Sequence, residues 1–156
     1  ETLRHRGCKP KTVLGGLMHD AKETYISDLP TPIKAAFDEK MVQLYGNEYA
    51  GLFSEVLQDV EYGIDTAICN AVGCITVDDM YNDYVKQADV DCLAYEARRI
   101  VHSAGKDWKF GREVKELPVD VIDMYGQIGH LSASVQIHRF KQLYDFLVKE
   151  ITDANV

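Results

Sequence analysis

The chain has 156 residues, of which 46% are hydrophobic and 27% are charged. This length and composition are typical of one globular domain and exclude wholesale disorder. The formal net charge of −8 argues against a duplex nucleic-acid partner, whose phosphates require a basic surface. No apolar run approaches the length of a membrane helix and no signal peptide is visible, so we expect a cytoplasmic protein.

Apolar residues recur at intervals of three and four along most of the chain, and no alternating strand pattern competes, so we expect an all-α fold. In chain order, the expected helical segments are 1–6, 11–27, 31–46, 48–60, 76–101, 119–125 and 132–151. The stretch 63–73 fits either a short helix or a buried loop, and 106–118 is expected to be a loop.

Residues that favour helix ends support these boundaries. Gly7 would stop the first segment, and Pro10 stands where the first turn of a helix tolerates proline. Thr31 is a good N-cap and Pro32 a good first helical residue, so a helix is expected to begin there after a stiff link. Thr76 should cap the long helix that follows it.

Cysteines and most histidines show no functional spacing. The four cysteines are Cys8, Cys69, Cys74 and Cys92. No two of them form a C-x-x-C pair and no histidine cluster accompanies them, so we expect free and mostly buried thiols rather than a zinc site. His102, His130 and His138 are scattered and are expected to be surface or core residues.

The segment Leu17–Tyr25 carries the pattern with the most chemical content. The adjacent His19 and Asp20 offer an imidazole and a carboxylate, and both are good ligands for Mn, Fe, Co, Ni or Zn. Neighbouring residues of a helix diverge by about 100°, but both side chains can still reach one ion. Glu23 would lie over the same face one turn later, where it suits a general acid or base beside a metal ion.

Two further carboxylates extend this pattern. Asp28 opens the stiff link and could be held toward the same pocket. Asp89 falls near the middle of the 76–101 helix, on or beside its apolar stripe, where a carboxylate needs a partner such as a metal ion. Each residue also has an ordinary interpretation by itself, as a chance pair, a solvated helix residue, a turn starter or a surface carboxylate. The functional interpretation depends on their combination and order.

This combination resembles the HD-domain metal-dependent phosphohydrolases. The run HDAxExxxxDLPTPxK, from His19 to Lys34, is similar to that of the bacterial 5′-deoxynucleotidases and of small HD proteins carried by phages. A second block, KQAD at 86–89 with the helical residues after it, resembles their later helix. The resemblance implies a single HD-type helical domain over 1–156.

Residue by residue, the resemblance implies a metal site and a catalytic carboxylate. His19, Asp20 and Asp89 would bind a divalent transition metal ion, which could be Mn, Co, Fe, Ni or Zn. Glu23 would activate or position the attacking water. Asp28 would assist near the phosphoester or the sugar.

The implied activity is nucleotide hydrolysis. A 5′-deoxynucleotidase that releases phosphate from deoxynucleoside monophosphates fits the motif best, with Lys34 and Lys86 as contacts to the substrate phosphate. A dNTP triphosphohydrolase is a close alternative, whereas the DLPTP link argues against hydrolysis of an alarmone or a cyclic nucleotide. The resemblance also suggests a homo-oligomer.

One part of the family pattern is missing from the chain. The family's metal site includes another histidine well upstream of the His-Asp pair, and the sole upstream candidate is His5, which we interpret as a surface residue at a helix end. Either an N-terminal helix that precedes Glu1 carries this ligand, which the helix-like start favours, or the site is degenerate and the chain is a non-catalytic binding module. Gly15 and Gly16 also depart from the family, and they predict a close helix crossing or a later helix start.

Overall fold

The computed structural model describes residues 1–103, 105–106, 108–128 and 131–154, without the side chains of Tyr125, Gln127 and Ile128. Every regular element in these residues is a helix and none is a strand, which confirms the predicted all-α fold class. None of the helices in the described ranges is long and apolar enough to cross a membrane.

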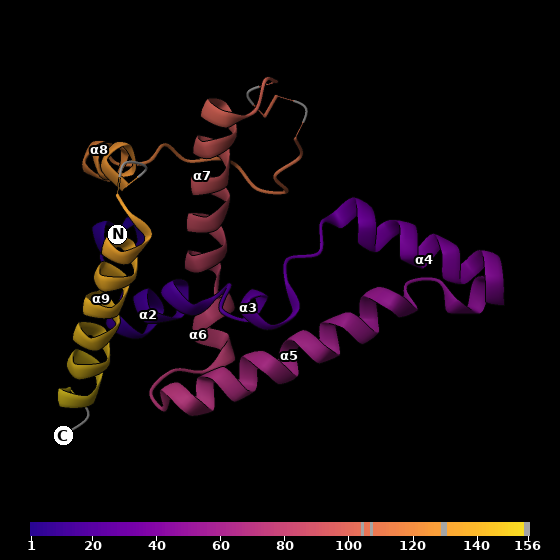
Figure 1. The fold of residues 1–156 in the computed structure, drawn as a ribbon, viewed down its shortest axis with the longest axis horizontal. Coiled ribbons are helices and arrows are strands. Elements are labelled where there is room, and N and C mark those ends of the chain that lie inside the picture. Colours follow the sequence, from indigo (N-terminus) through magenta and orange to yellow (C-terminus); the bar gives the residue numbers. More distant parts are fainter. Residues whose placement is uncertain (104, 107, 129–130, 155–156) are drawn as a thin grey trace. The chain divides into compact units, whose positions relative to one another are not determined.

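The chain divides into two compact units. The first unit combines Glu1–Met18 with Cys74–Val156, and the second unit is the segment His19–Gly73 between them. Each unit has its own helix packing (Figure 1). The expectation of a single HD-type domain over 1–156 stays a prediction.

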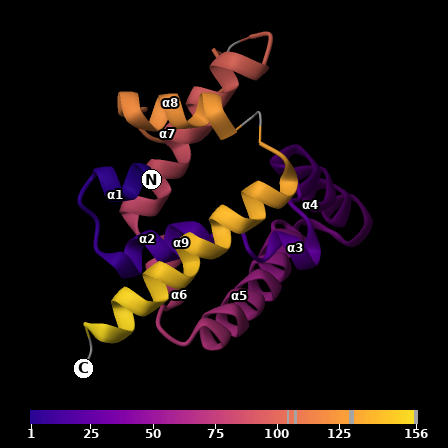
Figure 2. The same ribbon diagram turned by 60° about the vertical axis from the view of Figure 1, so that its left-hand side comes forward.

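The helix α2 is the central element of the first unit, since it packs against α1, α6, α7 and α9. The helices of this unit are α1 (Thr2–His5), α2 (Pro10–Met18), α6 (Val77–Tyr81), α7 (Asp83–Ile100), α8 (Val119–Ile128) and α9 (Ala133–Asp153). Figure 2 shows α9 lying across α2. Leu14, Met80 and Leu147 contribute one fully buried side chain each from α2, α6 and α9.

Two glycines let α2 approach its neighbours closely. A Cβ atom at Gly15 would overlap the backbone carbonyl of Asp79 in α6, and one at Gly16 would overlap the side chain of Leu3 in α1. The glycine pair therefore marks a close helix crossing, which is one of the two alternatives expected from the sequence. The predicted stop after α1 is also confirmed, because Gly7 follows that helix with a φ of 69°.

The prediction of one continuous helix over 11–27 is wrong. It consists of α2 and the short helix α3 (Glu23–Ile26), which are separated by a turn at 19–22. In this turn the backbone pairs at the tighter spacing of three residues, since the amide of Glu23 donates to the carbonyl of Asp20 at 3.0 Å. The His-Asp pair therefore lies in a turn and not inside a helix.

The helix predicted over 76–101 is also divided. Thr76 caps α6 as expected, in a capping box with Asp79. The Asn82 side chain then accepts hydrogen bonds from the next free amides and begins α7 as a separate helix. Tyr84 and Leu93 of α7 are 63% and 41% exposed. Met80 of α6 and Ala88, Ala94 and Ala97 of α7 are buried.

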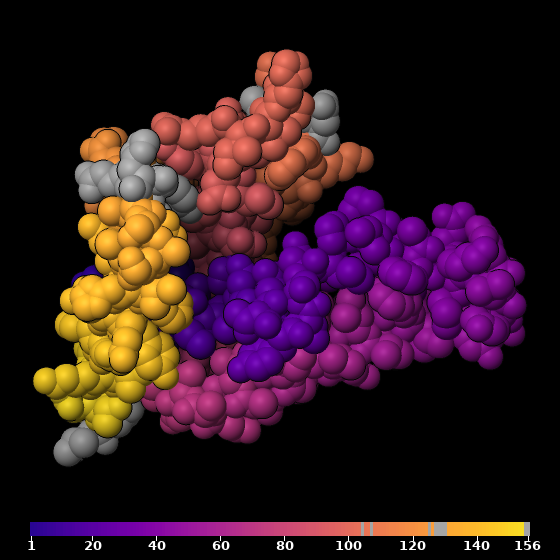
Figure 3. Space-filling model, viewed as in Figure 1, coloured from indigo at the N-terminus to yellow at the C-terminus, as the bar shows by residue number. Residues whose placement is uncertain are grey.

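The second unit contains a helical hairpin. Its helices α4 (Thr31–Tyr45) and α5 (Leu52–Val72) pack side by side, with the 3-10 helix η1 (Asn47–Tyr49) between them in sequence. Figure 3 shows their atoms in contact along the hairpin. Pro30, and not Thr31, is the N-cap of α4. The expected helix 48–60 begins later and continues through the ambiguous stretch 63–73.

A carboxylate of α4 closes this hairpin. Oδ1 of Asp38 accepts hydrogen bonds from the backbone amides of Phe53 and Ser54 at 3.0 and 3.3 Å. These amides belong to the first turn of α5, where no helical partner exists for them. The contact fixes the start of α5 against α4, and the Phe37 and Phe53 rings stack beside it with centroids 4.6 Å apart.

The remaining expectations are mostly confirmed. Helix α8 contains the expected segment 119–125, and α9 matches the expected 132–151 within two residues at each end. The described residues of 106–118 form no helix. All four cysteines are free, but only Cys69 is fully buried.

Candidate functional site

The His-Asp pair lies where the chain leaves α2. Nε2 of His19 is 3.2 Å from Oδ2 of Asp20, and the two side chains are 24% and 60% exposed. The pair is therefore compact, with an exposed Asp20 carboxylate, whereas the Nε2 atom of His19 is itself shielded from solvent.

This separation fits two ligands of one metal ion. Metal–ligand bonds of about 2.0–2.2 Å that meet at about 90–110° place the two donor atoms about 2.8–3.6 Å apart. An imidazole and a carboxylate are also the donors that transition metals such as Mn, Co and Zn accept. Over the residues that the structure describes, no group of three or more His, Cys, Asp or Glu side chains is arranged to hold one ion.

Glu23 belongs to the same group of charges. Burial raises its pKa above the ordinary value, and the carboxylates of Asp20 and Asp28 raise it further, while Lys22 and His19 act in the opposite direction. The charges of Asp20, Asp28 and His19 therefore all act on Glu23 within the second unit. We call the set of His19, Asp20, Glu23 and Asp28 the His-Asp cluster.

The link that carries Asp28 has a strained backbone. Ser27 has a φ of 61° and a ψ of 157°, a region that costs residues other than glycine about 1–3 kcal/mol. Among the described residues it is the only non-glycine residue with a positive φ. Strain of this kind persists only where surrounding contacts maintain it, and it is frequent at functional sites.

Two lysines near the cluster form ion pairs with α5. Nζ of Lys22 lies 3.3 Å from Glu61 and 3.6 Å from Asp65. Nζ of Lys34 lies 3.5 Å from Glu61. The motif predicts a contact between Lys34 and substrate phosphate, whereas the structure gives Lys34 a carboxylate partner 27 positions away in the sequence.

The other predicted site residues lie on α7, in the first unit. Lys86 and Asp89 are exposed and three positions apart, so they share one side of the helix. Asp89 does not lie on the apolar stripe of α7, and of the two expected places only one beside the stripe is compatible with its exposure. The buried acid of α7 is Asp91, which is 1% exposed and accepts hydrogen bonds from the Arg6 guanidinium at 2.5 Å and the Lys115 amide at 2.7 Å.

The sequence contains a signal for Asp91 that is independent of the metal-ligand pattern. The buried positions of α7 are Val85, Ala88, Asp91, Ala94 and Ala97. They recur every three residues, so the acid stands within a run of small apolar residues. A buried carboxylate could have been predicted there, but not its partner Arg6, which lies 85 positions away.

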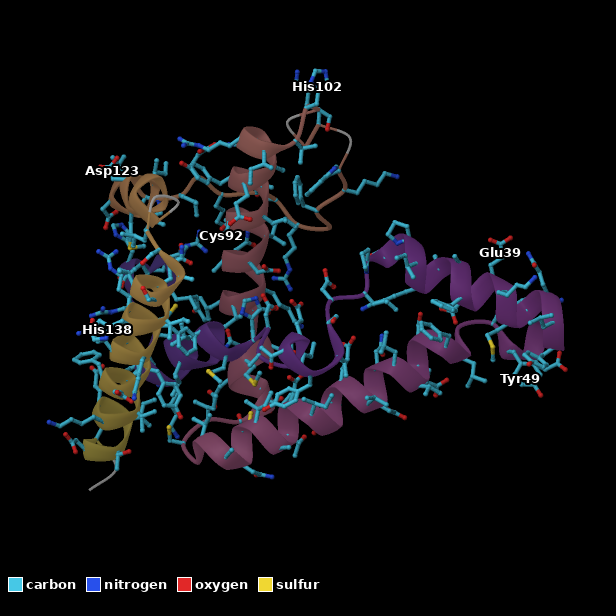
Figure 4. All side chains as sticks on the ribbon, viewed as in Figure 1. Glu39, Tyr49, Cys92, His102, Asp123 and His138 are labelled. Atoms are coloured by element: carbon cyan, nitrogen blue, oxygen red, sulfur yellow. The ribbon has the colours of Figure 1, made fainter. Side chains whose placement is uncertain are left out.

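The remaining described histidines lie apart from the cluster residues in sequence. His5 is exposed at the end of α1, as expected, with Nδ1 3.3 Å from Oδ2 of Asp120. Figure 4 shows His102 beyond the end of α7 and His138 on α9, well separated within the first unit. His130 lies outside the described residues.

Comparison of the chain with models of protein families, with curated proteins and with solved structures finds no match. The function must therefore be inferred from the residues of the chain, above all from the His-Asp cluster and the motif that contains it.

Proposed function

We propose that the chain is a metal-dependent phosphohydrolase of the HD-domain type that acts on nucleotides. The observation that supports this proposal is the His-Asp cluster, in which a closely spaced imidazole and carboxylate and two further carboxylates come from one short segment. The most specific form of the proposal is a 5′-deoxynucleotidase, because the run HDAxExxxxDLPTPxK is most similar to that branch.

In this proposal each residue has one role. His19 and Asp20 would hold a divalent ion, with Asp89 as the further ligand that the resemblance assigns. A bound divalent ion makes water more acidic and offsets negative charge on phosphoryl oxygens. Glu23 would accept a proton from the attacking water while the new bond to phosphorus forms and the bond to the nucleoside oxygen breaks, and the departing oxygen would take up a proton to leave as the nucleoside hydroxyl. Asp28 would contact the sugar or the phosphoester.

The electrostatics of Glu23 suit a proton acceptor. A general base is most effective when its pKa lies near the working pH, and an ordinary glutamate titrates well below neutrality. Burial and the neighbouring acids Asp20 and Asp28 raise the pKa of Glu23 in this direction.

The first test is an assay of phosphate and polyphosphate release from all deoxy- and ribonucleotides with Mn²⁺ or Co²⁺ added. We expect phosphate from deoxynucleoside monophosphates. Asp20→Asn and Asp89→Asn should abolish this release while circular dichroism shows an intact helical fold. Asp123→Asn is a matched control, because this acid is exposed on α8 in Figure 4, and it should retain the parental rate.

Other outcomes favour the alternatives. Release of triphosphate from dNTPs would favour a triphosphohydrolase. Metal binding with no product from any nucleotide would contradict an enzyme and favour a non-catalytic binding module. Glu23→Ala should bind the metal and lose rate, and parental turnover of that variant would exclude Glu23 as the catalytic carboxylate.

A further inference from the structure

Four charged side chains of the second unit form a row in space in which each contacts the next and the charges alternate in sign: Asp65, Lys22, Glu61 and Lys34. We call them the ion-pair chain. The separations are 3.6 Å from Asp65 to Lys22, 3.3 Å from Lys22 to Glu61, and 3.5 Å from Glu61 to Lys34. Side-chain exposure rises along it from 3% to 16%, 19% and 31%. The ion-pair chain therefore begins at Asp65 in the interior of the second unit and ends at Lys34 near its surface.

The ion-pair chain joins both segments of the His-Asp cluster to one helix. Lys22 lies in the turn between Asp20 and Glu23, and Lys34 lies near the start of α4, after the link that holds Asp28. The carboxylate partners of these lysines are Glu61 and Asp65, which stand one turn apart on α5. Glu61 contacts both lysines and so connects the two segments with each other.

Regular helical hydrogen bonding does not explain the position of either segment. The turn at 19–22 has the tighter three-residue backbone pairing, and the link at 27–30 contains the strained Ser27. Contacts from outside must therefore hold these segments in place. Ion pairs that are largely shielded from water are suited to this, because their attraction is screened less than that of exposed pairs.

We propose that Glu61 and Asp65 are positioning residues that fix the metal-binding turn and the Asp28 link relative to each other, through Lys22 and Lys34. This inference rests on the proposed function. It assigns Lys34 a structural task in place of a phosphate contact. Residues behind metal ligands typically change metal affinity about 10–100-fold when they are substituted.

A titration with Co²⁺ tests this inference, because the visible absorption of Co²⁺ reports the geometry of its ligands. We expect Glu61→Gln to raise the dissociation constant for Co²⁺ about 10–100-fold and to change the absorption bands. Glu55→Gln is the matched control, since it makes the same change at an exposed position of α5, and it should keep the parental affinity and spectrum. An ion pair with a role in stability alone would lower the urea midpoint of Glu61→Gln and leave the spectrum unchanged.

A second variant extends the test to the buried end of the ion-pair chain. Asp65→Asn should weaken Co²⁺ binding in the same way, with Asp59→Asn at an exposed position of the same helix as its control. If Asp65→Asn does not fold, Glu61→Gln decides the question, because Glu61 is less buried. Parental Co²⁺ affinity and spectrum in Glu61→Gln would overturn the inference.

Hydrogen exchange separates failure of this inference from failure of the proposed function. If the parent protein binds no Co²⁺, the proposed function is wrong. The positioning role is then judged from the amides of 23–27, which donate to backbone carbonyls in the parent. Faster exchange of these amides in Glu61→Gln than in Glu55→Gln would support it, and equal exchange would overturn it.

Discussion

Asp91 shows how a single buried carboxylate can organise its surroundings. It accepts hydrogen bonds from the side chains of Arg6 and Gln87 and from the backbone amide of Lys115. These donors replace the water that the carboxylate loses on burial, and the guanidinium supplies the opposite charge. Asp91 therefore connects the residue after α1, the helix α7 and the segment that follows it.

Asp89 and Asp91 should respond in opposite ways to the same substitution. Asp91→Asn removes the charge that compensates Arg6, so we expect the free energy of unfolding to fall by about 3 kcal/mol. Asp89→Asn alters an exposed side chain and should change the free energy of unfolding by less than about 0.5 kcal/mol. The same substitution should abolish the proposed metal-dependent hydrolysis. Urea unfolding of the metal-free variants measures both values. Equal losses of stability would contradict the separate roles of the two acids.

The Glu23 carboxylate should lower the stability of the fold at neutral pH although the proposed hydrolysis requires it. Its folded-state pKa is raised, so the ionised form is disfavoured in the fold relative to the unfolded chain. This unfavourable contribution is complete above the folded-state pKa and disappears as the pH falls below the ordinary value of 4.5. We expect metal-free Glu23→Gln to be more stable than the parent at pH 7 and equally stable near pH 4, although its hydrolysis rate is lost.

Urea midpoints at several pH values, in the presence of a chelator, measure this difference. The control is Glu55→Gln, which should have the parental midpoint throughout the range. A Glu23→Gln protein that is less stable than the parent at pH 7 would show that the carboxylate makes net favourable contacts in the fold.

At the scale of helices, local signals located some helix ends that apolar spacing did not reveal. The glycine stop after α1 and the Thr76 cap are short-range effects, and both are confirmed. The spacing of apolar residues did not reveal the breaks at 19–22 and at Asn82. Asn82 offers its own side-chain oxygen to the next amides, so it begins a helix where the apolar pattern continues without interruption.

The close crossing of α2 and α6 yields a prediction with an internal control. Gly15→Ala places a methyl group on the backbone of Asp79, and a backbone atom cannot rotate away, so we expect a loss of about 1–3 kcal/mol. Gly63→Ala makes the same change in α5, where nothing lies within 4 Å of the new atom. It should stabilise the protein by about 0.5–1 kcal/mol, because alanine favours a helix more than glycine.

Urea unfolding of the two glycine variants should therefore give changes of opposite sign. The comparison is informative because the effect of the substitution on the unfolded chain is similar at both sites. A stabilising Gly15→Ala would mean that α2 and α6 cross at a greater distance.

At the scale of the whole molecule, sequence separation decided which parts of the candidate site could be predicted. The four residues of the His-Asp cluster lie within one short segment, so one motif contains them all. The ion-pair chain and the Arg6–Asp91 pair join residues that are far apart in sequence, by 85 positions in the second case. A single sequence does not show which distant charges meet, so these contacts appeared only in the structure.

The net charge of −8 requires care with any metal experiment, because an acidic surface attracts divalent cations without a specific site. A specific ion that binds the folded protein stabilises it by mass action, by about 2.7 kcal/mol at a free concentration of 100 times the dissociation constant. For a chain of this size we expect Mn²⁺ or Co²⁺ to raise the midpoint of thermal unfolding by roughly 5–10 °C. Mg²⁺ and Ca²⁺ at the same concentration should raise it less, because imidazole ligands favour transition metals.

The variants of the acidic residues distinguish a specific site from surface binding. Asp20→Asn should remove the shift in the thermal midpoint, because it deletes one of the paired donors at 3.2 Å. Asp123→Asn deletes one exposed negative charge elsewhere and should keep the shift. If both variants retain it, the ion binds the acidic surface and the His-Asp pair is not its site. If only Asp20→Asn loses the shift, the pair holds the ion whether or not the chain hydrolyses a nucleotide, so metal binding and catalysis are tested separately.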